Sequence, residues 1–328
     1  MNRFGDRLRI GVIGVGYLGK FHAEKYAKMP DVDLVGVVDI DPARARKVAD
    51  GLHTQSYTHY EDLFGRVDAV SIVTPTPRHY TISRDFLTRG VDTFIEKPIT
   101  ASLTEADDLI ALAGDKGLII QVGHLERFNP AVIALADVID QPMFIESHRL
   151  SLFKDRALDV SVVLDLMIHD IDLLLNFIGC DITEIRASGV AVISERVDIA
   201  NARLEFENGC VANVTTSRVS MKNQRKIRLF QKNAYIAVDF AEREIITVKK
   251  GDSDSPHLIP GMQISSHRFD HEDPLDAELK SFVRSVYHRE TSKVPGEAGR
   301  NALAVALNIV AQIEANTHRL MESDDETP

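Results

Sequence analysis

The segment 163–172, which reads VLDLMIHDID, places acidic and basic side chains inside an otherwise apolar run. On an α-helix, which turns by about 100° per residue, Asp165, His169 and Asp172 fall within roughly 60° of one another, between apolar neighbours. Asp170 points elsewhere, which predicts a structural or surface role. Charged groups between apolar walls favour a pocket over bulk water. Because a histidine can accept a proton near neutral pH, this segment indicates an acid–base site.

The same stripe could instead hold a metal ion, since His169 with Asp165 or Asp172 has a plausible ligand spacing. No third ligand is evident, and Cys180 and Cys210 lack the CxxC spacing of a thiolate site. We therefore expect no metal. For Asp172, we expect a structural hydrogen bond.

A lysine stands at the end of another apolar run, in the tripeptide 96–98, EKP. An open parallel sheet presents the carboxyl ends of its strands to ligands. There Lys97 could hydrogen-bond a substrate hydroxyl and favour its deprotonation. The alternative is a surface lysine beside a turn proline. The bond to Pro98 is a candidate cis peptide, which would set the direction of Lys97.

A glycine-rich turn at 14–19, GVGYLG, follows the first apolar run and opens a helix-like segment. Glycines at these three positions permit a tight turn and a close backbone approach, and a helix N-terminus attracts a pyrophosphate. Asp39 lies 20 residues beyond Gly19 (39 − 19) and could bind ribose hydroxyls. Because a carboxylate repels a 2′-phosphate and no arginine follows Asp39 directly, we predict NAD in preference to NADP.

The elements that must position these residues follow two patterns. Before residue 124, short apolar runs alternate with helix-like segments, as in a parallel sheet covered on both faces. The expected strands are Arg9–Gly14, Leu34–Asp39, Ala69–Thr74, Thr93–Glu96 and Leu118–Val122, with helices at Tyr17–Lys28 and Pro42–Asp50, the latter capped by Asp41.

From residue 124 onward, alternating stretches predict antiparallel strands. These are Phe144–Leu150, Glu184–Ile193, Ile199–Phe206, Cys210–Ser217, Lys226–Phe230, Ala234–Asp239 and Ile245–Val248, with helices at Pro130–Asp137, over the polar stripe, and at Ala277–Tyr287 and Glu297–His318.

Composition narrows the class of protein. The 328 residues carry a formal net charge of −11 without a basic run, which predicts neither a nucleic-acid nor a membrane partner. With two cysteines and a start that resembles neither a signal peptide nor a membrane span, we expect a cytoplasmic protein.

Four motifs, GVGYLGKFH, VTPTPRHY, FIEKPIT and LDLMIHDID, occur in the order and spacing of the glucose-fructose oxidoreductase/inositol dehydrogenase (Gfo/Idh/MocA) family, which this chain resembles over nearly its whole length. The resemblance implies an α/β Rossmann domain with a doubly wound parallel sheet at 1–123, which binds NAD. It also implies a substrate-binding and oligomerisation domain at 124–328, an α+β domain with an open, mainly antiparallel sheet, which packs into homodimers or homotetramers. The implied catalytic residues are Lys97, His169 and Asp165; which of Lys97 and His169 takes the proton stays open. The cofactor-binding residues expected from the motifs are Gly14, Gly16, Tyr17, Leu18, Gly19, Asp39, Thr74, Pro75, His79, Glu96, Lys97 and Gln121.

Two segments near the polar stripe are candidates for substrate contact. GHLERFNP at 123–130 resembles the family's first substrate-lining stretch, and SHRLSLFKDR at 147–156 adds cations suited to a diphosphate. Solvated loop charges are the alternative. The candidates are His124, Arg127, Asn129, Arg149, Lys154 and Arg156, beside Asp165 and His169.

Together these stretches are similar to the nucleotide-sugar branch of the family. That similarity implies NAD-dependent oxidation of UDP-N-acetylglucosamine at its 3-hydroxyl, on the route to the 2,3-diamino sugars of lipid A. An inositol or free-sugar dehydrogenase of the same family is one alternative. A non-catalytic NAD-binding regulator is the other, against which the lysine, histidine and aspartate argue.

Overall fold

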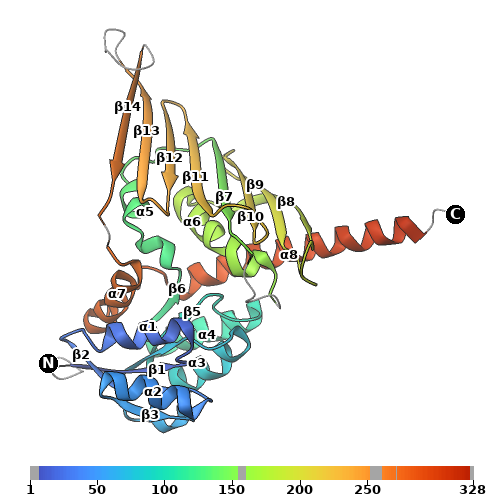
Figure 1. Cartoon of the computed structure of the whole chain (residues 1–328). Coiled ribbons are helices and arrows are strands. Elements are labelled where there is room, and N and C mark those ends of the chain that lie inside the picture. Colours follow the sequence, from blue (N-terminus) through green and yellow to red (C-terminus); the bar gives the residue numbers. More distant parts are fainter. Residues whose placement is uncertain (1–6, 154–159, 252–260, 271, 326–328) are drawn as a thin grey trace. The chain divides into compact units, whose positions relative to one another are not determined.

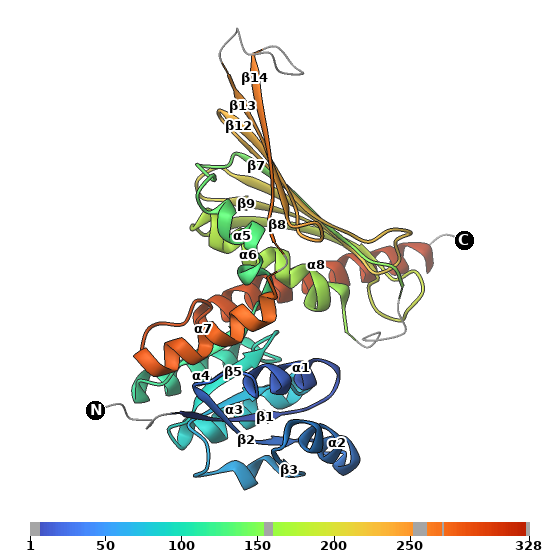
Figure 2. The ribbon, with the colours of Figure 1, turned by 60° about the vertical axis from the view of Figure 1, so that its left-hand side comes forward.

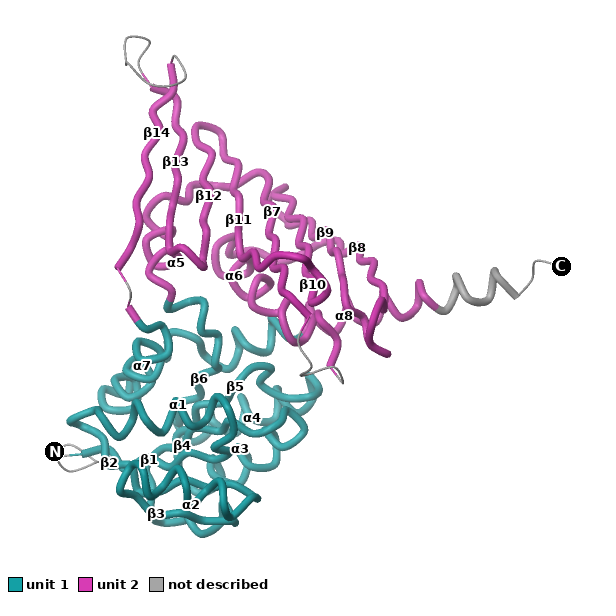
Figure 3. The backbone as a smooth tube through the Cα atoms, in the orientation of Figure 1, with its two compact units in different colours: residues 1–128, 273–303 teal, residues 129–272, 304–328 magenta. Residues whose placement is uncertain are grey.

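The computed structural model describes residues 7–153, 160–251, 261–270 and 272–325. Two sheets dominate it (Figure 1). Contacts divide the chain into two compact units, unit 1 with residues 1–128 and 273–303 and unit 2 with residues 129–272 and 304–328 (Figure 3). The units are not contiguous in sequence. Residues 273–303, which lie after the expected boundary at 123/124, pack with unit 1.

Unit 1 contains a parallel sheet with strand order β3-β2-β1-β4-β5-β6, which is the order of a Rossmann fold. This confirms the expected doubly wound parallel sheet. Its strands are β1 Leu8–Ile13, β2 Val32–Val38, β3 Gln55–Tyr57, β4 Ala69–Ile72, β5 Asp92–Glu96 and β6 Ile120–Gly123. Its helices are α1 Tyr17–Tyr26, α2 Pro42–Leu52, α3 His79–Thr88, α4 Leu103–Lys116 and α7 Pro274–His288, with short turns η1 Tyr60–Leu63, η2 Thr76–Arg78 and η3 Leu125–Phe128.

The central strands of unit 1 are buried because both faces of the sheet are covered. All residues of β4, β5 and β6 are buried, and one core cluster joins residues of α1, β1, β2 and α7. Helix α2 begins at the predicted cap, where the Asp41 carboxylate accepts from the backbone N–H of Ala43 at 3.0 Å and of Arg44 at 3.2 Å. Because all six strands are parallel, their carboxyl ends lie on the same side of the sheet.

Unit 2 contains an eight-stranded sheet with order β14-β13-β12-β11-β7-β10-β9-β8. Every neighbouring pair is antiparallel except β7 and β10, which confirms the mainly antiparallel expectation. The strands are β7 Phe144–Leu150, β8 Ile182–Val190, β9 Ile199–Phe206, β10 Val211–Ser217, β11 Gln224–Gln231, β12 Ala234–Asp239, β13 Glu244–Lys250 and β14 Met262–Arg268.

Helices α5 (Pro130–Leu135) and α6 (Ile168–Ile178) lie against one face of this sheet, and the other face carries no helix in the part of the chain that the structure describes (Figure 2). Buried and half-buried residues alternate along β7, as expected for a strand with one covered face. Helix α8 (Gly296–Asp325) begins in unit 1 and continues in unit 2.

Two strands were missing from the sequence prediction. Strand β3 is only three residues long, and all seven residues of β14 are exposed, so neither shows the alternation that identifies a half-buried strand. Both lie at the edge of their sheets, where a strand has only one neighbour and can remain exposed.

Candidate active site

Three glycines shape the turn between β1 and α1. Gly14 has φ +86°, and a Cβ on it would lie 2.7 Å from the Val73 carbonyl oxygen. A Cβ on Gly19 would lie 1.8 Å from the carbonyl oxygen of Gly14, so the helix can approach the turn only without a side chain there. A Cβ on Gly16 would meet nothing within 4 Å, which leaves open space above the first turn of α1. The turn therefore forms a cradle at a helix N-terminus.

Asp39 follows β2 and is held in place by several donors. Its Oδ2 accepts from the Val15 N–H at 3.0 Å, and its Oδ1 accepts from the Asp41 N–H at 3.0 Å. The Arg44 guanidinium lies 3.2 Å from Oδ1 and 3.3 Å from Oδ2. Arg44, which was not among the predicted residues, lies in the first turn of α2 and reaches back to the carboxylate.

A groove beside this turn runs along α1 and α2. Its lining residues are Val15, Gly16, Tyr17, Lys20, Glu24, Arg44, Lys47, Val48, Gly51 and Leu52. Tyr17 is 76% exposed and Leu18 is 36% exposed, so both predicted contacts lie at the surface of the turn. The open cradle, the cations and the fixed carboxylate suit a dinucleotide, with the pyrophosphate at the turn and the ribose at Asp39. NAD, when bound, supplies a hydride acceptor.

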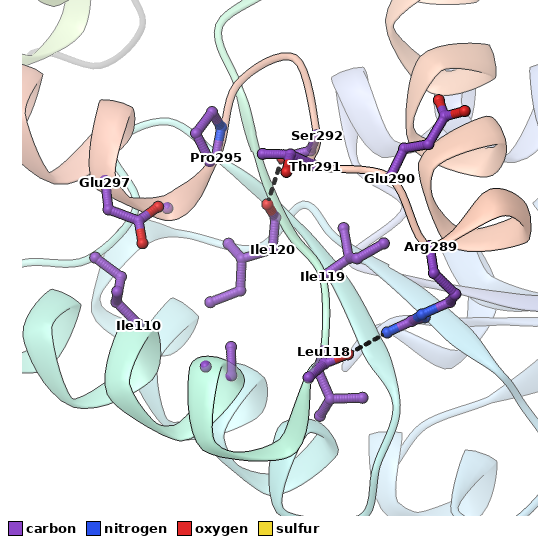
Figure 4. Close-up of a pocket in the computed structure, with 14 residues that line it drawn as sticks. Ile110, Leu118, Ile119, Ile120, Arg289, Glu290, Thr291, Ser292, Pro295 and Glu297 are labelled. Carbon is purple, nitrogen blue, oxygen red and sulfur yellow. Dashed lines mark hydrogen bonds between the residues drawn. The ribbon is translucent and has the colours of Figure 1, made fainter.

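Another hollow of unit 1 lies at the amino end of β6, away from the carboxyl ends of the strands (Figure 4). There the Ser292 hydroxyl donates to the Ile120 carbonyl at 2.7 Å, and Leu118 and Ile119 line the amino end of β6. Ligands of open parallel sheets bind at the carboxyl ends, so this hollow is not the cofactor site.

His79 connects two turns at the carboxyl edge of the parallel sheet. Its Nε2 lies 2.7 Å from the Thr74 carbonyl oxygen, and its Nδ1 lies 2.8 Å from that of Pro98. Burial lowers the pKa of His79 below its ordinary value, although the two carbonyls act in the opposite direction. Pro75, another predicted cofactor contact, is exposed beside Thr74.

The EKP tripeptide follows directly from β5. Glu96 is 8% exposed, and its Oε2 accepts from the Lys97 backbone N–H at 3.2 Å. The Lys97–Pro98 peptide bond is cis, as the sequence predicted. Lys97 is half-buried. Gln121, expected near the cofactor, is fully buried, and its Nε2 donates to the Glu278 carbonyl on α7 at 3.0 Å.

The substrate candidates of unit 1 follow β6. His124 is 1% exposed, whereas Arg127 is half-buried. Lys293 lies over the Phe128 ring at 4.9 Å, and burial, followed by the charge of Arg127, lowers the pKa of Lys293. Arg127 is therefore one of two neighbouring cations in this part of unit 1.

In unit 2 the polar stripe begins with a π-helical turn, Val163–Met167, before α6. The Ile168 N–H donates to the Val163 carbonyl, five residues back. A π-helical turn contains more residues than an α-helical turn. The angle of about 100° per residue, from which the positions of Asp165 and His169 were predicted, therefore does not apply within Val163–Met167. Asp165 and His169 are half-buried, whereas Asp172 is 1% exposed and so lies in the interior of unit 2.

Asp170 has the structural role that the sequence suggested. It is 2% exposed, and its carboxylate accepts from Arg149 at 2.7 and 3.2 Å and from the Ser147 hydroxyl at 3.0 Å. The pair is bidentate and buried, which holds α6 on β7. Arg149, a predicted diphosphate contact, thus forms a buried ion pair with Asp170.

A pocket of 300 Å³ in unit 2 adjoins this pair. Its lining residues are Arg149, Leu150, Ser151, Leu152, Asp165, Leu166, Arg218, Asn223, Gln224, Arg225 and Ala241. Three arginines and Asp165 thus line one pocket. Arg218 and Arg225 were not among the predicted residues. Arg225 stands opposite Arg149 across β11 and β7, a register that the sequence does not reveal.

Asp198 fixes the loop before β9 and lies 3.8 Å from Arg218. Its carboxylate accepts from the N–H groups of Val192, Ile193 and Ser194 at 2.8, 2.7 and 2.9 Å. Burial alone would raise the pKa of Asp198, but these bonds and the Ser194 hydroxyl hold it at about 2. Asp198 thus stays ionised at neutral pH and orders one side of the Arg218 guanidinium.

Asn129, a predicted substrate contact, is the N-cap of α5. Its Oδ1 accepts from the Ala131 N–H at 3.1 Å as the cap of α5, and its Nδ2 donates to the Phe240 carbonyl at 3.3 Å. Both ends of this buried amide are used inside unit 2, because a helix that begins with Pro130 needs a cap. Lys154 and Arg156 lie outside the described residues.

Within the described ranges, no three His, Cys, Asp or Glu side chains are grouped as a metal site would need. Likewise, among those ranges no helix has both the length and the apolar character to cross a bilayer.

The fold and the cradle define a nicotinamide-dinucleotide-binding oxidoreductase. Residues 8–124 match the model of the oxidoreductase family with an NAD-binding Rossmann fold, and residues 139–237 match the Gfo/Idh/MocA C-terminal domain. The chain belongs to the Gfo/Idh/MocA family.

Relatives of known name are similar over nearly the full length. UDP-N-acetylglucosamine 3-dehydrogenase from Acidithiobacillus ferrooxidans is 38% identical over 95% of this chain and 99% of its own. The structure of that enzyme has a TM-score of 0.90 over 94% of this chain and 98% of the other. Myo-inositol 2-dehydrogenase from Thermotoga maritima is 27% identical over 90% and 93%. Scyllo-inositol dehydrogenase from Lactobacillus casei with bound NAD(H) is 20% identical, with a TM-score of 0.79 over 94% and 98%, and shows a shared fold.

Proposed function

We propose that this chain is an NAD-dependent dehydrogenase that oxidises the 3-hydroxyl of UDP-N-acetylglucosamine to a ketone. The observation that carries the proposal is the likeness, 38% identity over 95% of the chain, to a UDP-N-acetylglucosamine 3-dehydrogenase. The pocket that contains Asp165 and three arginines supports it, since guanidinium groups bind diphosphates well.

In this proposal Lys97 and His169 act on the sugar hydroxyl, and Asp165 orients the imidazole or the sugar. A neutral imidazole can take the hydroxyl proton near neutral pH, and a lysine ammonium can hydrogen-bond the oxygen and favour its ionisation. Comparing kcat pH profiles for His169→Asn and Lys97→Met distinguishes the two groups. The variant that lacks the proton acceptor loses the acidic limb of the profile, whereas loss of the other group lowers kcat without removing that limb.

The direct test is to incubate the purified protein with NAD and separate candidate sugars while NADH formation is followed. We expect turnover of UDP-N-acetylglucosamine and none of N-acetylglucosamine or myo-inositol. Turnover of myo-inositol with none of the UDP-sugar would replace the proposal with an inositol dehydrogenase. NADH binding without turnover of any sugar would favour a regulator.

We further propose a setting for this activity. A 3-keto sugar is the substrate that an aminotransferase needs to make a 2,3-diamino sugar, as on a route to lipid A. Cys180 and Cys210 are both free, which supports a reducing, cytoplasmic compartment.

The helix-free face of the eight-stranded sheet, which includes Tyr235 and Ile246, is proposed to join copies into a dimer or tetramer. Light scattering after gel filtration would test this, and a monomeric mass would reject it.

A further inference from the structure

A buried polar cluster lies in unit 1 behind the EKP tripeptide. His22 of α1 is fully buried, and its Nδ1 lies 2.9 Å from the Ser71 hydroxyl of β4. Its Nε2 lies 3.2 Å from Oε1 of Glu96 at the end of β5. One imidazole thus bridges a helix and two neighbouring strands.

Only a side chain with two separated nitrogens can make both contacts. The Phe94 ring packs edge-on against His22, with ring centroids 5.3 Å apart, and limits rotation of the imidazole. With the proton on Nε2, His22 can donate toward Glu96 while Nδ1 accepts from the hydroxyl of Ser71. In the structure Nδ1 is within hydrogen-bond distance of Ser71, whereas Nε2 lies 3.2 Å from Glu96 without the alignment of a hydrogen bond.

Glu96 transmits this contact to the catalytic lysine. One of its oxygens faces His22, and the other accepts from the Lys97 N–H at 3.2 Å. A Cβ on Gly123 of β6 would lie 2.9 Å from the Glu96 carboxylate. The carboxylate therefore fits beside β6 only because residue 123 has no side chain.

Other titratable groups surround the same carboxylate. Burial, and after it the carboxylates of Glu278 and Glu96, raises the pKa of the Tyr26 phenol, which therefore stays neutral. The charge of Glu96 also acts on His79, where it raises the pKa against the larger, lowering effect of burial. Among the groups named, only the His22 imidazole contacts both a strand hydroxyl and a Glu96 oxygen.

We propose that His22 is a positioning residue that holds Glu96 in the rotamer to which the Lys97 N–H is bonded, and so sets the orientation of Lys97 toward the substrate. The inference rests on the proposed function, in which Lys97 acts on the sugar hydroxyl. His22 does not touch the reacting atoms; it acts through Glu96.

Two variants separate the two contacts of His22. A glutamine amide reaches the position of Nε2, and an asparagine amide reaches that of Nδ1. We expect His22→Gln, which keeps the contact with Glu96, to retain most of the kcat of the unaltered protein. His22→Asn, which loses that contact, should lower kcat by about 10- to 100-fold, the loss typical of a misplaced catalytic group. KM and the Kd of NADH, measured by its fluorescence, should stay unchanged in both.

A second readout needs no substrate. Acetylation of Lys97 by acetic anhydride, followed by mass spectrometry across a pH series, reports the surroundings of its amine. His22→Asn should shift this profile for Lys97 but not for Lys116, which lies on α4 and donates to the Thr88 carbonyl at 3.0 Å. If UDP-N-acetylglucosamine is not the substrate, the unaltered protein shows no turnover while the labelling still tests His22.

Several outcomes would overturn the inference. Equal losses of kcat and Tm in both variants, with unchanged labelling of Lys97, would reduce His22 to a packing residue. A fall in NADH affinity would place its effect on the cradle at the start of α1. Should neither variant fold, Glu96→Ala removes the carboxylate through which His22 acts; an unchanged kcat and an unchanged labelling profile of Lys97 in that variant would also reject the proposal.

Discussion

At the scale of single residues, Asp39 is engaged more fully than a ribose contact requires. Two backbone N–H groups and the Arg44 guanidinium all reach its carboxylate. The negative charge that disfavours a 2′-phosphate is therefore held beside a cation that could bind one. No arginine follows Asp39 directly in the sequence, but Arg44 reaches its carboxylate from the first turn of α2.

We expect Asp39→Ser alone to raise the ratio of kcat/KM for NADP to that for NAD by about 10- to 100-fold, the equivalent of one or two charged hydrogen bonds. The added Arg44→Ala should remove this gain, because the guanidinium would then be absent. Steady-state kinetics with both cofactors measures the ratio. An unchanged ratio in Asp39→Ser would show that Asp39 does not select the cofactor.

Arg225 tests the assignment of the unit 2 pocket. Its guanidinium belongs to the pocket that contains Asp165, and a charged hydrogen bond to a diphosphate is worth about 1.5–3 kcal/mol. Arg225→Ala should therefore raise KM for UDP-N-acetylglucosamine by about 10- to 100-fold with little change in kcat. The control is Arg186→Ala, because the Arg186 side chain is 74% exposed in a surface pair with Glu184. Equal effects of the two variants would contradict a diphosphate role.

At the scale of elements, the contact between the glycine turn and α1 decides whether the cradle forms. Gly19→Ala places a Cβ 1.8 Å from the Gly14 carbonyl oxygen, so α1 must move away from the turn. We expect a lower Tm and at least a tenfold weaker NADH affinity, or about 1.4 kcal/mol.

Gly114→Ala in α4 is the matched control, since its Cβ would meet nothing within 4 Å. That variant should gain about 0.5–1 kcal/mol of stability, because alanine is the better helix former. Thermal melts and NADH fluorescence titrations measure both variants. An unaltered NADH affinity in Gly19→Ala would show that the turn tolerates displacement.

The π-helical turn before α6 is an element that the sequence pattern did not predict. A wheel assumes a constant angle per residue, but Val163–Met167 is wound more widely than the helix that follows. The helical wheel places Asp165, His169 and Asp172 on one stripe. In the structure Asp165 and His169 are half-buried and Asp172 is buried.

At the scale of the whole molecule, acid should weaken the two units in succession. The pKa of His79 in unit 1 is lowered from 6.5, so the unfolded chain takes up its proton first and the free energy of unfolding decreases as the pH falls below about 6.5. The pKa of Asp198 in unit 2 is about 2 instead of 3.8, so its contribution is complete above 3.8 and is lost as the pH falls toward 2.

Hydrogen exchange at a series of pH values, read from peptides of each unit, measures this order. Peptides around His79 should lose protection between pH 7 and 5, and those around Asp198 only below pH 4. His79→Gln should remove the first change and leave the second. Simultaneous loss of protection in both regions near pH 6 would contradict the assignment.

The sequence by itself determined the parts of this protein that depend on local chemistry. The glycine turn, Asp39 at the end of β2, the cap at Asp41 and the EKP tripeptide are short patterns whose geometry is set by neighbouring residues, and the apolar runs specify a parallel sheet with two covered faces.

Only the tertiary structure decided which distant residues meet. Arg225 stands opposite Arg149, and His22 contacts both Ser71 and Glu96. Strand register and helix packing create such contacts, and neither leaves a signal in the spacing of residues along the chain.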